Sequence, residues 1–186
     1  LRIGIRDMLE MGRTDELCRE LSNMAQAIIE VATQDCLRTY EQRHGTPREE
    51  MSGERAAFAV YAMGKFGAGE LNFSSDVDLI FVYSEEGKTE GVPEGVGNAP
   101  VRQISNHEFF NKVAQELVRI LSHRSTEGFL FRVDVRLRPE GNAGPLARSR
   151  PAYSLYFSGH AGVWEKIPYL KARFIAGDEN LAAQFD

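Results

Sequence analysis

Residues 57–83 decide the fold, and they read AFAVYAMGKFGAGELNFSSDVDLIFVY. Residues 57–63 are apolar, a glycine-dense turn follows, and residues 77–83 are again almost wholly apolar. A near-continuous apolar run of this length is typical of a strand that is covered on both faces. We therefore predict two core strands, at 57–63 and 77–83, joined by a turn at 64–71.

A long amphipathic helix is predicted ahead of these strands, at residues 14–43, with a polar linker at 46–56. Apolar residues recur there at spacings of three and four, and Gly45 and Pro47 mark the end. The predicted inward stripe consists of Leu17, Leu21, Met24, Ile28 and Val31. The chain therefore reaches its first strand through a helix that has one apolar face.

Helix and strand alternate after the second strand as well. Residues 84–103 are rich in glycine, proline and charge and predict a long surface loop. An amphipathic helix is predicted at 105–123 and a third, alternating strand at 129–137. Residues 151–186 predict helix in pieces, with Trp164 in the core. This order of elements indicates an α+β domain in which helices pack on a small mixed sheet.

Composition excludes several classes of protein. The chain has 186 residues, 42% hydrophobic and 26% charged, as in an ordinary folded domain. A net charge of −5 argues against a nucleic-acid partner, and the lack of an 18-residue apolar run argues against a membrane span. Cys18 and Cys36 are roughly 27 Å apart on one helix, so we predict free thiols and a cytoplasmic location. The first residue is Leu1, and we expect a fragment of a longer protein.

Two carboxylates begin the second strand. Asp76 and Asp78 are separated by one residue, so on a strand they point to the same face, with Cα atoms about 6.5 Å apart. Like charges held together repel unless a cation lies between them. Carboxylate oxygens suit Mg²⁺, which takes further ligands from substrate phosphates. The alternative for an Asp-x-Asp pair alone is a solvated turn.

The glycine turn adds an anion site beside this pair. Its glycines let backbone N–H groups approach a phosphate without interference from a Cβ atom. Hydroxyl groups and a lysine follow in the same segment. The predicted phosphate-binding residues are Gly64, Lys65, Gly67, Ser74 and Ser75.

A third carboxylate is predicted from the strand at 129–137. Asp134 alternates onto one face with Arg132, Arg136 and Arg138, so it is either a metal ligand or an ion-pair partner of an arginine. Three carboxylates hold two metal ions in many phosphoryl-transfer sites. Arg136 and Arg138 are predicted to grip phosphate oxygens, and Lys171 faces either substrate or solvent.

These motifs resemble one known family. The segment from Gly64 to Phe81, the Val133–Pro139 segment with its following glycines, and the Trp164–Asp178 segment are similar to the nucleotidyltransferase signature of glutamate–ammonia-ligase (glutamine synthetase) adenylyltransferases. The resemblance implies a polymerase-beta-like palm at 46–150, a helical segment at 1–45 and another at 151–186. It also implies two Mg²⁺ ions on Asp76, Asp78 and Asp134.

The family enzyme is two-headed, and the resemblance extends to one head. The residues 72–76 and 144–146 look more like the half that removes AMP from a glutamine synthetase tyrosine by phosphorolysis, releasing ADP. The other half adds AMP from ATP. Either activity regulates nitrogen assimilation, and the nitrogen-regulatory PII protein is an implied partner of the full-length enzyme. A nucleotide-binding regulatory module without turnover is the alternative from another class.

Overall fold

The computed structural model describes residues 2–73, 75–93, 101–126, 128–159 and 161–185. Its helices are α1 (Arg2–Met8), α2 (Thr14–His44), α3 (Gly64–Gly67), α4 (Asn106–Leu121), α5 (Arg150–Gly159), α6 (Val163–Lys166) and α7 (Glu179–Phe185), with 3-10 helices η1 (Gly141–Ala143) and η2 (Ile167–Lys171). Its strands are β1 (Pro47–Glu49), β2 (Phe58–Ala62), β3 (Val77–Tyr83), β4 (Gly87–Thr89), β5 (Val92–Pro93), β6 (Val101–Arg102), β7 (Arg124–Ser125), β8 (Gly128–Phe129), β9 (Val133–Asp134), β10 (Ala147–Ser149) and β11 (Arg173–Gly177).

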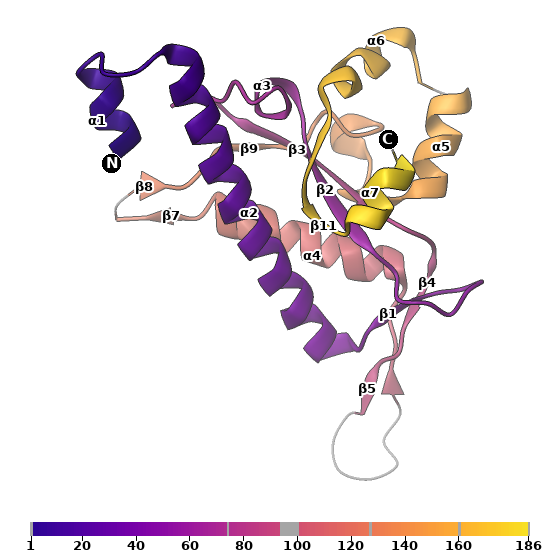
Figure 1. Ribbon diagram of the computed structural model, residues 1–186. Helices are drawn as coiled ribbons and strands as arrows, with labels where there is room; N and C mark the ends of the chain where they lie inside the picture. Colours follow the sequence, from indigo (N-terminus) through magenta and orange to yellow (C-terminus); the bar gives the residue numbers. More distant parts are fainter. Residues whose placement is uncertain (1, 74, 94–100, 127, 160, 186) are drawn as a thin grey trace.

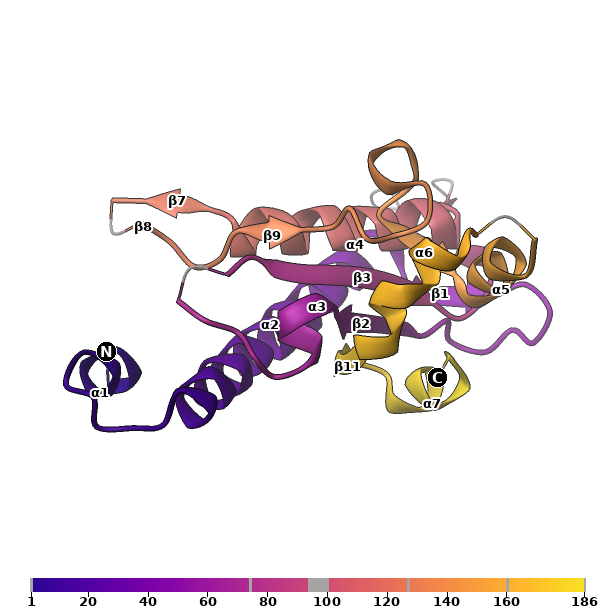
Figure 2. The same cartoon turned by 90° about the horizontal axis from the view of Figure 1, so that it is seen from above.

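Strand β3 is the centre of a five-stranded mixed sheet (Figure 1). One edge of β3 pairs antiparallel with β2, which in turn pairs antiparallel with β11. The other edge pairs in parallel with β9 at the start of β3, which Figure 2 shows, and with β10 at its end. Strands β9 and β10 therefore flank one edge of β3 in turn, and the chain leaves the sheet between them.

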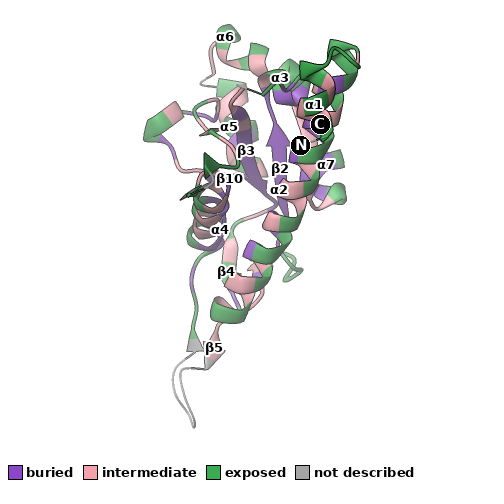
Figure 3. Ribbon diagram, turned by 90° about the vertical axis from the view of Figure 1, so that its left-hand side faces the viewer, coloured by how far each residue is buried: buried purple, intermediate pink, exposed green. Residues whose placement is uncertain are grey.

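The sheet is covered on both faces, which explains why its central strands are apolar throughout. Leu79 and Phe81 of β3 pack against helices α2 and α4 in the larger core. Ile80 and Val82 alternate onto the opposite face and pack with residues of α5 and α7. Figure 3 shows β2 and β3 buried between these layers. The predicted fold class, a small mixed sheet backed by helices, is confirmed.

Helix α2 forms at the predicted residues, but its buried stripe is different. Met24 and Val31 are 45% and 67% exposed, so their predicted inward position is wrong. Leu17 and Leu21 are buried as predicted, and Ile28 is partly buried against the larger core. The other buried positions are Ser22, Ala25, Ile29, Thr33 and Cys36. Several of these side chains are small, and they bring the helix close to α4 and β11. Close approach of backbones, rather than maximum hydrophobicity, selects the inward face.

Two sequence predictions about strands are corrected. Within the described part of residues 129–137, strand pairing is confined to Phe129 of β8 and to β9. Residues 173–177, predicted to lie in or next to helix, form β11 beside β2. Pairing with a strand more than 100 residues earlier decides this, and local periodicity carries no signal of such a contact. The prediction that Trp164 lies in the core is also wrong, because it is 74% exposed and lies outside both cores.

The linker and the long loop are more regular than expected. Strand β1 lies in the predicted linker and pairs with β4 of the predicted loop. Strands β5 and β6 pair with each other, and the residues 94–100 between them are outside the described part of the chain. This segment therefore extends from the sheet as paired strands where it is described.

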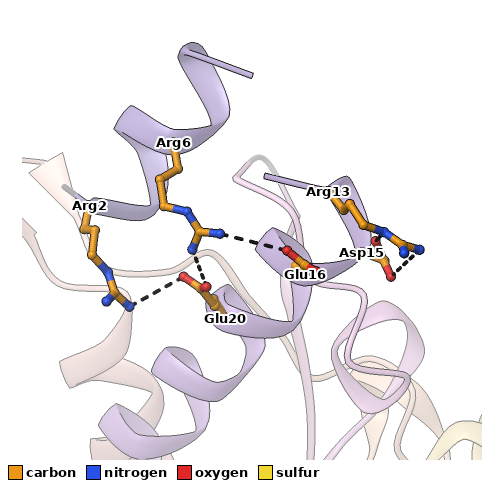
Figure 4. A network of polar contacts seen from close by, with 6 residues as sticks. All are labelled: Arg2, Arg6, Arg13, Asp15, Glu16 and Glu20. Atoms are coloured by element: carbon orange, nitrogen blue, oxygen red, sulfur yellow. Dashed lines mark hydrogen bonds and ion pairs between the residues drawn. The ribbon is translucent and has the colours of Figure 1, made fainter. Parts of the chain in front are cut away.

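Helix α1 is attached to α2 mainly by charge (Figure 4). Arg6 pairs with Glu20 and lies 4.0 Å from Glu16, while Arg2 lies 3.6 Å from Glu20. All described residues of α1 are at least partly exposed. Exposed ion pairs contribute little to stability, so these contacts hold α1 only weakly.

The remaining expectations concern cysteines and membranes. Cys18 and Cys36 are free thiols, as predicted. Among the described residues, no helix is both long enough and apolar enough to cross a membrane.

Candidate active site

The three predicted acidic residues lie together at the start of β3. Asp78 is the second residue of β3, and its register partner on the parallel strand β9 is Asp134. Register partners on neighbouring strands project to the same face, and Asp76 shares the face of Asp78 because it lies two residues earlier. The core residue Ile80 marks this face as the one covered by the C-terminal helices.

The carboxylates interact electrostatically. Partial burial, together with the negative charges of Asp134 and Asp76, raises the pKa of Asp78 to about 6. Hydrogen bonds from Arg136 instead hold the pKa of Asp134 below its ordinary value. Asp76 lies 2.6 Å from Arg132 as an ion pair. Arginines therefore neutralise the two outer carboxylates, and Asp78 carries the repulsion that remains.

The acidic group has suitable donors for a hard cation but is not assembled as a metal site. Within the part of the chain that the structure describes, no set of three or more Asp, Glu, His or Cys side chains is placed to hold a metal ion. Asp134 and Asp76 are each turned toward an arginine. The ion-pair alternative for Asp134 thus describes the geometry seen, with Arg136 as its partner.

The glycine turn closes over Asp78. Gly64 has a φ of +55°, and a Cβ atom there would lie 2.8 Å from Asp78 Oδ2. The N–H of Met63 donates to the backbone carbonyl of Asp78 at 2.9 Å. A Cβ on Gly67 would lie 1.9 Å from the carbonyl oxygen of Lys171. Glycine is thus required at both ends of α3, once beside the carboxylate and once against η2.

Arg173 fixes this turn, a role that sequence reasoning missed. Its guanidinium donates to the carbonyls of Gly67 at 3.1 Å and Phe66 at 3.3 Å, and to Gln26 Oε1 at 2.6 Å. It also lies over the Phe66 ring, 5.9 Å from its centroid. The signal available in the sequence is an arginine at the head of an apolar strand, which alone does not indicate a clamp.

The other predicted phosphate-binding residues differ in their surroundings. Lys65 is exposed on α3, and Lys171 Nζ lies 3.9 Å from Glu70 Oε2 beside the same turn. The Ser75 hydroxyl donates to Asn72 Oδ1 at 2.5 Å and so closes its own turn. Ser74 lies outside the described residues.

The two predicted phosphate-gripping arginines differ sharply. Arg136 is exposed and pairs with Asp134. Arg138 is 8% exposed, and its nitrogens donate to the carbonyls of Gly144, Pro145 and Val135. Because these bonds occupy its guanidinium, Arg138 holds the 135–145 loop in place.

Comparison with known proteins shows which family this chain is similar to. A family model described as glutamate-ammonia ligase adenylyltransferase matches residues 1–186. A protein of Nitrosococcus oceani, a bifunctional glutamine synthetase adenylyltransferase/adenylyl-removing enzyme, is 43% identical over 179 residues, 96% of this chain. The protein of the same name from Pseudomonas putida is 42% identical over 184 residues, 99% of this chain. The chain spans 18% of the length of each relative. A match along its entire length places this chain in the glutamate-ammonia ligase adenylyltransferase family.

Proposed function

We propose that this chain is a metal-dependent nucleotidyltransferase domain that acts on glutamine synthetase. In the favoured direction it removes AMP from an adenylylated tyrosine by phosphorolysis and releases ADP. The relatives carry both an adenylyltransferase and an adenylyl-removing activity in their name. Regulation of nitrogen assimilation in the cytoplasm, with PII as a partner of the longer protein, belongs to the same proposal.

The observation that supports it best is the placement of Asp78. Its carboxylate lies beside those of Asp76 and Asp134, under a glycine that leaves room next to Oδ2. An uncompensated carboxylate destabilises a folded protein, and such groups are found most often at functional sites. A divalent cation supplies the missing positive charge, so Asp76, Asp78 and Asp134 are the residues we assign to two Mg²⁺ ions.

Two arginines of the site, Arg132 and Arg136, could exchange a carboxylate partner for a phosphate. Cations held by the carboxylates would compete with Arg132 for Asp76 and with Arg136 for Asp134. Both guanidinium groups are exposed and can then turn toward phosphate oxygens, to which arginine binds in a forked geometry. The backbone of Gly64 lies beside Asp78 at the start of the glycine turn, and Lys65 follows it as an exposed cation.

The reaction forms one bond to phosphorus and breaks another. An oxygen of inorganic phosphate attacks the phosphorus of the adenylyl group, the bond from phosphorus to the tyrosyl oxygen breaks, and the tyrosinate takes a proton. Bound Mg²⁺ would neutralise the phosphate oxygens and the departing oxygen. In the opposite direction, in which ATP supplies AMP, we assign to Asp134 the acceptance of the tyrosine proton.

The direction is tested by offering both substrates. The chain is incubated with adenylylated glutamine synthetase and labelled phosphate, or with unmodified glutamine synthetase and labelled ATP. Release of labelled ADP supports removal, and labelled glutamine synthetase supports the adding activity instead. Nucleotide binding by calorimetry without product in either assay supports the regulatory module and contradicts an enzyme.

The acidic residues are tested by Asp76→Asn. We expect turnover to fall at least about 100-fold, the scale for losing one electrostatic element of an active site, while the circular dichroism spectrum stays unchanged. Asp35→Asn is the matched control, since Asp35 is an exposed residue of α2 that pairs with Arg38. Near wild-type phosphorolysis by the Asp76 variant would show that the metal assignment is wrong.

A further inference from the structure

A cavity lies next to the acidic group of Asp76, Asp78 and Asp134. It has a volume of about 320 Å³ and is bounded by the 136–141 loop on one side and by α5, α6 and η2 on the other. Its aromatic lining includes Tyr156, Trp164 and Tyr169, and Arg136 forms part of its wall. Because Arg136 also binds Asp134, the cavity and the acidic group share a residue.

Hydrogen bonds brace the walls of this cavity. The hydroxyl of Tyr169 donates to the carbonyl of Leu137 at 3.0 Å and so ties η2 to the loop. The hydroxyl of Tyr156 donates to Glu165 Oε1 at 2.6 Å, and the N–H of Gly162 donates to Glu165 Oε2 at 2.8 Å. These bonds join α5 to α6 and hold the Glu165 carboxylate at the cavity. Two tyrosine rings and one carboxylate of the cavity are therefore held by hydrogen bonds within the fold.

Trp164 is the unexplained member of this lining. It is the single tryptophan of the chain, and 74% of it is exposed. A large aromatic ring left in water next to a preformed cavity is typical of a ligand site rather than of a core. Stacking on a planar ring would give this side chain the contact that it lacks in the fold.

We propose that this cavity binds the adenine ring of the adenylyl group, with Trp164 as its stacking surface. The inference rests on the proposed function, because it places the base of the transferred nucleotide beside the carboxylates. The volume falls within the range of small-molecule sites, about 300–1,000 Å³. Glu165 offers carboxylate oxygens to the exocyclic amino group, and Arg136 lies between the base and the carboxylates.

A tyrosine ring of the protein substrate is the competing planar group. In the adenylylated substrate its phenol oxygen is bonded to phosphorus and has no proton to donate to Glu165, whereas the exocyclic amino group of adenine does. We therefore assign the cavity to the nucleotide, and the experiment separates the two rings.

Tryptophan fluorescence gives a direct measurement, because Trp164 is the sole source of that signal. The chain is titrated with AMP, adenosine, ribose 5-phosphate and N-acetyltyrosinamide. We expect saturable quenching by AMP and by adenosine, and an unchanged signal with the other two. An unchanged signal with AMP, or equal quenching by ribose 5-phosphate or the tyrosine analogue, would overturn the proposal.

Substitutions of the ring test its contribution to affinity. We expect Trp164→Ala to weaken AMP binding about 10-fold in calorimetry, as the loss of one stacked base does, and Trp164→Phe to retain most of the affinity. Leu170→Ala is the control, since Leu170 is 86% exposed on η2 and is not among the cavity residues. Unchanged AMP affinity in Trp164→Ala would also overturn the proposal.

The two proposals fail in different ways. Quenching by AMP in a chain that transfers no adenylyl group supports the adenine site and contradicts the proposed activity. Release of ADP by a chain whose Trp164 fluorescence does not respond to AMP supports the activity and contradicts the adenine site.

Discussion

Asp78 of β3 and Asp134 of β9 are register partners on parallel strands, and the charge of Asp134 contributes to the raised pKa of Asp78. The chain encodes this juxtaposition with two short motifs more than fifty residues apart. Strand pairing brings them together, and Arg136 pairs with Asp134 while it offsets the repulsion at Asp78 only in part. The pair is therefore a place where the fold accepts unfavourable electrostatics.

The repulsion at Asp78 predicts that the free energy of unfolding depends on pH. Asp78 has a folded pKa of about 6, above the ordinary 3.8, so its stabilising contribution is present below pH 3.8 and is lost as the pH rises through 6. We expect Asp78→Asn to be more stable than the wild type at pH 7, by about 1–2 kcal/mol after allowing for solvent screening. The two proteins should converge near pH 4. Urea unfolding at pH 4, 5.5 and 7 measures this, and a wild type more stable than the variant at pH 7 would contradict it.

Divalent cations should stabilise the fold through the same carboxylates. At a Mg²⁺ or Mn²⁺ concentration ten times the dissociation constant, the free energy of unfolding should rise by about 1.4 kcal/mol. Thermal unfolding with the metal, and again after chelation by EDTA, measures the change. Asp134→Asn is the control, because it removes one of the assigned ligands and should abolish the shift. A shift of equal size in that variant would place the cation elsewhere.

The two left-handed glycines of the turn make a matched pair of substitutions. Gly69 has a φ of +73°, and no described atom lies within 4 Å of the position that a Cβ would take, so Gly69→Ala should cost about 1 kcal/mol from backbone strain alone. Gly64→Ala adds a methyl group 2.8 Å from Asp78 Oδ2 and should cost more. It should also reduce turnover well beyond the Gly69 variant. Equal activity in the two variants would show that the space beside Asp78 is not used.

Replacement by lysine should destabilise the fold far more at Arg138 than at Arg136. Lysine lacks the forked donors that serve three carbonyls at Arg138, so Arg138→Lys should destabilise the fold by about 2–3 kcal/mol. At the exposed Arg136 the same change should cost under about 1 kcal/mol. Chemical unfolding of both variants measures the difference. Comparable losses would contradict the structural role of Arg138.

The sequence predicts the central fold well, because residues 57–83 combine two near-continuous apolar runs with an intervening turn. Strand β3 begins and ends at the predicted residues, Val77 and Tyr83. Helix α4 begins after the capping residue Ser105, whose hydroxyl accepts from the Glu108 N–H. Such signals are local, and the chain needs no distant partner to express them.

What the sequence could not predict depends on distant contacts. Strand β11 exists because β2 offers it an edge, and β10 exists because β3 does. Residue type and spacing are enough to single out the motif residues Asp76, Asp78 and Asp134 as candidates. Which arginine pairs with which carboxylate, and the exposure of Trp164, depend on the assembled fold.

The contacts of Arg173 limit where this domain can be truncated. It opens β11 and at the same time joins Gln26 of α2 to the end of α3. A truncated chain that stops at residue 172 therefore loses an outer strand and the anchor of the glycine turn in a single cut. The uncovered backbone of β2 would then be open to pairing with other molecules, which is a route to aggregation. Expression boundaries chosen from the motifs alone, ending near residue 150, would produce that defect.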